Sequence, residues 1–89
     1  MVYSPPYQQK KQRIIEQFWG AEEGITMLEH AILNRPVVSQ PIREINNFKI
    51  YQRPTAVSIY ETFIYPEGRL IITYAVQDHT GLVVFLDIH

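Results

Sequence analysis

Residues 69–89 read RLIITYAVQDHTGLVVFLDIH, and this stretch has the clearest pattern in the sequence. Residues 69–76 and 82–88 are rich in β-branched and aromatic side chains, and a short polar segment ending in Gly81 separates them. Such runs favour strands, and a polar segment between them is typical of a hairpin turn. The stretch therefore predicts two antiparallel strands joined at residues 77–81.

Side chains alternate across a strand, so each strand of this hairpin has two faces. One face is almost wholly apolar, which predicts that it packs on the rest of the core. It carries Leu70, Ile72, Tyr74, Val76, Leu82, Val84, Leu86 and Ile88. The other face is mixed, and it is either solvated or part of a site. It carries Arg69, Ile71, Thr73, Ala75, Val83, Phe85, Asp87 and His89.

Two further strands are predicted upstream of the hairpin. Residues 57–65 continue the β-branched and aromatic composition. Residues 65–69 (Tyr-Pro-Glu-Gly-Arg) suit a three-residue hairpin loop, because proline sets the second turn position and glycine takes the left-handed one. Residues 48–52 are predicted as a short strand followed by a turn at residues 53–55. Residues 37–47, with a proline and two asparagines, are predicted as a connecting loop.

Two amphipathic helices are predicted before the sheet. Ser4 followed by two prolines is typical of a helix start, because serine caps and proline is tolerated in the first turn. Gly20 is a natural stop, and Arg35 closes the second helix because it precedes a proline. The short connection between them predicts an antiparallel helical hairpin. The apolar stripes carry Tyr7, Ile14, Ile15, Phe18 and Trp19, and then Ile25, Leu28 and Ile32.

The predicted fold class is therefore α+β, a helical hairpin followed by an antiparallel three- to four-stranded sheet, in a single domain over residues 1–89. The helices are expected to bury one side of the sheet. The residues expected to be buried together are Ile14, Phe18, Leu28 and Ile32 with Leu70, Ile72, Val84 and Leu86.

The composition excludes several classes of protein. The net charge is −1, 46% of residues are hydrophobic and 19% are charged, which is typical of an ordered globular domain rather than a strongly basic nucleic-acid binder. The chain has no cysteine, so disulfides, thiolate metal sites and a cysteine nucleophile are excluded. His30, His79 and His89 are not at metal-ligand spacing, so no metal or cofactor is expected.

The expected location is the cytoplasm, without membrane insertion. The start of the chain has no basic segment followed by an apolar run, and no apolar stretch approaches the roughly 18 residues of a membrane span. Lys10, Lys11 and Arg13 form a short basic run, which is interpreted as a solvated helix face rather than as a phosphate contact.

One row of side chains is the candidate site. Centring the second hairpin on His79, and allowing a three-residue loop after Tyr65, places Tyr65, Arg69 and His89 side by side across three strands. Arginine matches the oxygens of a phosphate, histidine exchanges protons near neutral pH, and tyrosine stacks on a base. Asp87 is either a charge on an open sheet face or the group that orients His89. The alternative for the whole row is that it merely covers the sheet.

The last 22 residues also resemble a known family. Gly68-Arg69-Leu70-Ile71-Ile72-Thr73-Tyr74-Ala75-Val76, then Asp78, then Leu82 to His89, looks like the end of the RelE/ParE toxin superfamily. Members often open this strand with arginine and close the next on histidine, and two helices before an antiparallel sheet also suit the family. The resemblance implies a ribosome-dependent mRNA endoribonuclease in which Arg69 and His89 match the family's arginine and histidine.

Three functions remain open on this interpretation. The first is a ribonuclease toxin, acting by attack of a 2′-hydroxyl on the adjacent phosphate. The second is a non-catalytic binding or regulatory module, either a homodimer or an adaptor, which the low pI favours. The third is a gyrase-directed toxin of the same superfamily. The expected partners are an antitoxin, the ribosome with its mRNA, or a second copy, because a long apolar last strand left at a sheet edge is an aggregation hazard.

Overall fold

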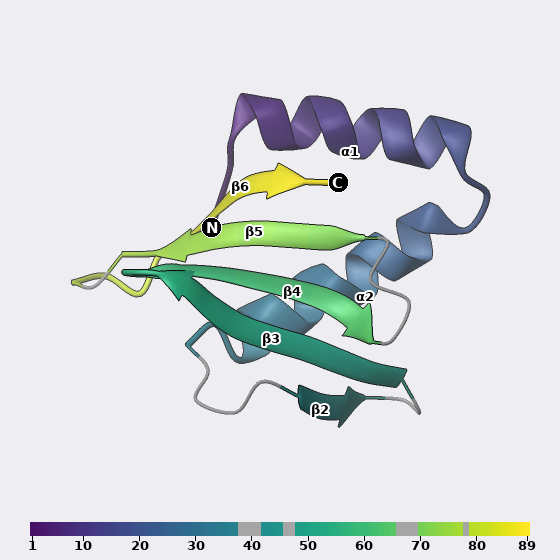
Figure 1. Ribbon diagram of the computed structural model, residues 1–89. Coiled ribbons are helices and arrows are strands. Elements are labelled where there is room, and N and C mark those ends of the chain that lie inside the picture. Colours follow the sequence, from purple (N-terminus) through teal and green to yellow (C-terminus); the bar gives the residue numbers. More distant parts are fainter. Residues whose placement is uncertain (38–41, 46–47, 66–69, 78) are drawn as a thin grey trace.

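The computed structural model describes the chain except for residues 38–41, 46–47, 66–69 and 78, and the side chains of 42–45, 48–49 and 64–65 are also left undescribed. The described part contains two helices and six strands (Figure 1). The helices are α1 (Pro5–Gln17) and α2 (Ala21–Asn34). The strands are β1 (Val2–Tyr3), β2 (Ile42–Ile45), β3 (Phe48–Ala56), β4 (Ile59–Tyr65), β5 (Ile71–Val76) and β6 (Val83–Ile88). The α+β fold class is confirmed, with more strands than the predicted three or four.

The strands form one sheet in the order β1-β6-β5-β4-β3-β2. All neighbours are antiparallel except β1, which pairs in parallel with β6 through Val2↔Val84 and Tyr3↔Phe85. The last strand of the chain is therefore an inner strand. The expectation of a partner that covers an exposed last strand therefore loses force, because the first residues of the chain pair with β6 at Val84 and Phe85.

The two helices cover the sheet at different places. In Figure 1, α2 crosses behind β3 and β4, whereas α1 runs along the β6 side. The helices turn back on each other as predicted, but each packs mainly on the sheet. Buried side chains from both helices and from one sheet face form a single core. Its members are Tyr7, Ile25, Leu28, Ala31, Ile32, Ile50, Ile72, Tyr74, Val76, Val83, Phe85 and Ile88.

Ser4 starts α1 and ties it to β6. Its side-chain oxygen accepts a hydrogen bond from the Tyr7 N–H (3.4 Å) and donates one to the Leu86 carbonyl (3.0 Å), while the Ser4 N–H donates to the Phe85 carbonyl (3.0 Å). The predicted start at serine and two prolines is confirmed. Helix α1 ends at Gln17, and Gly20 adopts the left-handed conformation (φ 81°) that lets the chain turn into α2.

Part of the predicted core lies elsewhere. Leu28, Ile32 and Ile72 are buried as expected, and Ile14 is half-buried, but Phe18 is 61% exposed. The physical reason is that Phe18 caps α1 in an extended conformation (φ −123°, ψ 116°), so the helical spacing that placed it on the apolar stripe no longer applies.

The face prediction is correct for β5 and wrong for most of β6. Ile72, Tyr74 and Val76 are buried in the predicted alternation. In β6 the buried residues are Val83, Phe85 and Ile88, while Val84 and Leu86 are half-buried. The cause is the turn, which shifts the register by one residue so that Val76 pairs with Val83 instead of Leu82. A β-bulge then reverses the alternation: Tyr74 pairs with Phe85 but Thr73 pairs with Asp87, so Leu86 is an extra residue and Ile88 lies on the predicted face.

The connections upstream also differ from the prediction. Residues 37–47, predicted as a loop, contain β2, and residues 53–55, predicted as a turn, lie inside β3. The chain turns at residues 57–58 instead, where Ser58 has a positive φ of 59°. Strand β3 continues through Pro54 because the register shifts between Pro54 and Ala56. At such an irregularity not every backbone N–H has to donate to the neighbouring strand, so a proline is tolerated.

Thr62 offers a test of this core. Its Oγ1 is buried and has no hydrogen-bond partner among the described residues. Because an unsatisfied buried hydroxyl is unfavourable, Thr62→Val should leave the free energy of unfolding unchanged or raise it by up to about 1 kcal/mol in urea denaturation. The matched control is Thr80→Val, which removes the acceptor of the Leu82 N–H and should be destabilising. A loss above about 1 kcal/mol for Thr62→Val would contradict this packing.

Candidate functional site

The three predicted site residues are described to different extents. Tyr65 is the last residue of β4 and pairs through its backbone with Lys49 of β3, but its side chain is not described. Arg69 lies outside the described residues. His89 directly follows β6 and is exposed.

His89 does not lie opposite Arg69. Its backbone exchanges two hydrogen bonds with Ile71, from the Ile71 N–H to the His89 carbonyl (2.8 Å) and from the His89 N–H to the Ile71 carbonyl (3.1 Å). The predicted register is thus wrong by two residues. The turn contributes one, because Val76 pairs with Val83 rather than Leu82, and the bulge contributes the other.

The described part of the preceding hairpin has the predicted register, since Phe63 pairs with Ile71. The predicted pair of Tyr65 with Arg69 lies outside the described pairs. Tyr65, two residues beyond Phe63 on β4, belongs to the row next to that of His89.

Two rows of side chains cross the sheet face opposite the buried one. The first, here the aromatic row, consists of Tyr51, Phe63, Ile71 and His89. The second, here the charged row, consists of Arg53, Glu61, Thr73 and Asp87. In the aromatic row the Tyr51 and Phe63 rings stack with centroids 4.9 Å apart, and the Arg53 guanidinium lies 5.5 Å from the Tyr51 ring centroid.

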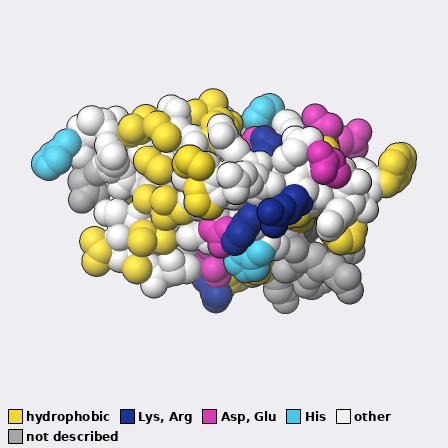
Figure 2. All heavy atoms as spheres, turned by 90° about the horizontal axis from the view of Figure 1, so that it is seen from above, with side chains coloured by type: hydrophobic (Ala, Val, Ile, Leu, Met, Phe, Trp, Pro, Cys, Tyr) yellow, Lys and Arg dark blue, Asp and Glu magenta, His cyan; other side chains and the backbone are white. Residues whose placement is uncertain are grey.

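The charged row is extended by a residue of α1. Lys10 Nζ donates a hydrogen bond of 2.7 Å to Asp87 Oδ1, and the other carboxylate oxygen of Asp87 is 3.8 Å from His89 Nδ1. We call Lys10, Asp87 and His89 the β6-end cluster. Figure 2 shows basic, acidic and histidine side chains side by side near the middle of the surface seen from the α1 side.

The β6-end cluster brings together the His89 imidazole, the Asp87 carboxylate and the Lys10 ammonium. The hydrogen bond from Lys10 is the main reason why the pKa of Asp87 is lowered, so this carboxylate stays ionised at neutral pH beside the imidazole. The carboxylate lies 3.8 Å from His89 Nδ1, where its charge and position favour one orientation of the imidazole ring. The sequence predicted a solvated Lys10, because nothing in it indicates that residues 77 positions apart come into contact.

Asp87→Asn should weaken the fold slightly and in a pH-dependent manner. The Lys10 and Asp87 side chains are 48% and 38% exposed, so solvent limits the pair to about 0.5 kcal/mol. Because folding lowers the pKa of Asp87 below its ordinary 3.8, the contribution is present above that value and is lost as the pH falls through the folded-state pKa.

Urea unfolding at about pH 7 and about pH 2.5 measures this difference between the wild type and Asp87→Asn. The difference should vanish at the lower pH, and Lys10→Gln should reproduce the loss at the higher one. A difference of the same size at both pH values would mean that Asp87 acts otherwise than through its charge.

An apolar groove adjoins His89 at the junction of the two helices. We call it the junction groove. It is lined by Ile14, Phe18, Trp19, Gly20, Ala21, Leu70 and His89. His89 therefore stands between this groove and the open sheet face.

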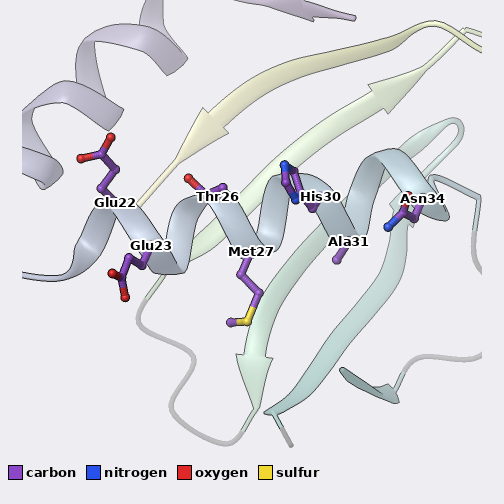
Figure 3. A pocket seen from close by; sticks show the side chains of 7 residues that line it. All are labelled: Glu22, Glu23, Thr26, Met27, His30, Ala31 and Asn34. Carbon is purple, nitrogen blue, oxygen red and sulfur yellow. The ribbon is translucent and has the colours of Figure 1, made fainter. Parts of the chain in front are cut away.

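A second hollow runs along α2 and is made of polar and apolar side chains from that helix alone. Its lining residues are Glu22, Glu23, Thr26, Met27, His30, Ala31 and Asn34. Figure 3 shows Glu22, Thr26 and His30 projecting from one side of the helix and Met27 from the other. Within the described part of the chain, no three histidine or carboxylate side chains are grouped to hold a metal ion. We interpret this hollow as a helix surface.

Comparison with protein families, characterised proteins and solved structures gave no match to this chain. Among the described helices, none is both long and apolar enough to cross a membrane.

Proposed function

We propose that the chain is a RelE/ParE-like toxin module that acts on RNA, with the β6-end cluster as its reactive part. The observation that carries the proposal is the single carboxylate of Asp87, which contacts the Lys10 ammonium and lies 3.8 Å from the His89 imidazole. The resemblance of the last residues to that superfamily supplies the reaction class.

The order of elements supports the proposal. The superfamily usually opens with a strand, followed by two helices and an antiparallel sheet, and this chain has β1 before α1 and α2. Strand β1 also holds the strand that leads into His89 as an inner strand of the sheet. The proposed reactive end is thereby attached to a paired strand and to α1.

The proposed reaction is attack of an RNA 2′-hydroxyl on the adjacent phosphate. The reaction needs a group that accepts the hydroxyl proton, a group that donates a proton to the leaving 5′-oxygen, and a cation near the developing negative charge. His89 is proposed for proton exchange, and Lys10 and Arg69 for the phosphate charge. Tyr65 is proposed to stack on a base, next to the aromatic row.

The second candidate is a non-catalytic binding module on the same scaffold. It is favoured by the pairing of charges on the open sheet face. Arg53 donates to Glu61, and Lys10 donates to Asp87, so both described cations of the charged row are already neutralised. A surface without excess positive charge attracts a polyanion weakly.

Induced expression in bacteria distinguishes the two functions. The wild-type chain should arrest growth, and His89→Ala should restore colony counts by at least about 100-fold, because removing a proton-exchanging group typically costs 100- to 10,000-fold in rate. Lys10→Met should also restore growth, whereas the control Arg13→Met, which removes a charge of the same helix outside the cluster, should not.

Soluble expression and circular dichroism of each variant separate lost function from lost folding. A chain that leaves growth unaffected, or a His89→Ala variant as toxic as the wild type, would contradict the ribonuclease proposal. Either result would favour the non-catalytic module.

A further inference from the structure

We infer that the junction groove docks a basic, amphipathic helical segment of another protein. The inference does not rest on the ribonuclease proposal, because it concerns apolar surface and charge around Phe18 and Trp19. It identifies an interaction surface distinct from the open sheet face, with His89 at the boundary between them.

Two aromatic side chains of the groove, Phe18 and Trp19, do not belong to the hydrophobic core. Trp19 is fully exposed (103%) and Phe18 is 61% exposed, next to half-buried Ile14 and Leu70. Solvent exposure of two neighbouring aromatic rings is unfavourable, and aromatic residues in such positions commonly anchor a protein partner. An incoming amphipathic helix would present apolar side chains spaced at i and i+4 to such a groove.

Acidic residues lie next to the lining of the groove, and we call them its rim. Residues 16–23 read EQFWGAEE, so Glu16, Glu22 and Glu23 flank the two aromatics in the sequence, and Glu22 and Glu23 line the neighbouring hollow along α2. The last turn of α1 contains no basic residue. At the end of the molecule where α1 joins α2, Figure 2 shows a protruding hydrophobic side chain near several acidic ones.

The negative charge of these acidic residues favours one class of binding partner over another. A second copy of the chain, docking through the same patch, would bring Glu16, Glu22 and Glu23 of both copies together, and like charges across an interface are unfavourable. An amphipathic segment with lysine or arginine beside its apolar face places opposite charges on the rim instead. Such a segment would also contact His89, which lines the groove.

Trp19 is the only tryptophan of the chain, so its fluorescence reports directly on the groove. The probes are two helical peptides of roughly 18 residues with the same leucine face, one carrying lysines on the polar face and the other glutamates. At about 50 mM salt, the lysine peptide should shift the Trp19 emission to shorter wavelength and bind at least about 10-fold more tightly than the glutamate peptide.

Variants locate the binding and its charge preference. Phe18→Ser should weaken binding of the lysine peptide at least about 10-fold, because it removes one of the two exposed anchors. Glu22→Lys with Glu23→Lys should reverse the preference toward the glutamate peptide. The control Val57→Ser removes an exposed apolar residue that does not line the groove and should bind like the wild type.

Three outcomes would overturn the inference. They are an emission that neither peptide shifts, equal affinity for both peptides, and a shift to shorter wavelength that grows with protein concentration alone. The last would assign the groove to a second copy. None of these measurements involves RNA, so their failure is distinguishable from failure of the ribonuclease proposal.

Discussion

Phe85→Ala should lower the free energy of unfolding by about 3–5 kcal/mol, the largest stability effect expected in this chain. Phe85 is fully buried, and its ring lies 4.8 Å from that of Tyr3 and 5.2 Å from that of Tyr7, measured between centroids. The three aromatics join β6, β1 and α1. Removing the central ring leaves a cavity among groups that their own backbone hydrogen bonds hold in place.

Chemical denaturation followed by circular dichroism measures this loss. Small domains have total stabilities of about 5–15 kcal/mol, so a loss of this size should move the unfolding midpoint to much lower denaturant concentration. Phe85→Leu provides a milder test, with an expected loss of about 1.5 kcal/mol or less. Val57→Ala, at a residue 90% exposed, is the control and should change stability by less than about 0.5 kcal/mol. A loss below about 1 kcal/mol for Phe85→Ala would show that the aromatic cluster is not packed as described.

Glu29→Ala should destabilise the fold by about 2–4 kcal/mol. Glu29 is only 7% exposed, and its Oε2 accepts hydrogen bonds from the Tyr7 hydroxyl (2.6 Å) and from Lys11 Nζ (3.1 Å). Burial, together with the hydrogen bond and charge of Glu29, raises the pKa of Tyr7 well above its ordinary value of 10.0. Without the carboxylate, a buried phenol loses its acceptor and a half-buried ammonium loses its counter-charge.

A triple variant tests whether the loss comes from unpaired groups. Tyr7→Phe, Lys11→Met and Glu29→Leu together should restore most of the stability, because replacing every member of a buried polar network with apolar groups is often neutral. Glu23→Ala, an exposed acidic residue of the same helix, is the control and should change little. A Glu29→Ala variant as stable as the wild type, measured in the same urea titration, would contradict the described link between α1 and α2.

Local signals in the sequence predicted the elements that depend on local physics. The serine and prolines at residues 4–6 predicted the start of α1, and the alternation of Ile72, Tyr74 and Val76 predicted the buried face of β5. The bulge at Leu86 has no comparable signal, since no glycine or proline marks it and Val83 and Phe85 are as apolar as Val84 and Leu86. Strand β1 has two residues and exists only because β6 is there to pair with.

The candidate site could also be predicted only in part. Asp87 was interpreted either as a charge on an open sheet face or as the group that orients His89, and the two side chains lie 3.8 Å apart. The partners across the sheet depended on the register, which the turn and the bulge each shifted by one residue. Lys10 was interpreted as solvated because its contact with Asp87 joins opposite ends of the chain.

The β6-end cluster is proposed to cleave RNA through attack of a 2′-hydroxyl, a reaction that leaves a 2′,3′-cyclic phosphate. Mapping RNA ends that carry this group, after brief induction of the wild-type chain and of His89→Ala, tests the proposal most directly. The wild type should produce new cyclic-phosphate ends within messenger RNA, and the His89→Ala variant should reduce them at least about 100-fold while remaining folded. Growth arrest by the wild type without new ends, or equal numbers of ends with both chains, would contradict it.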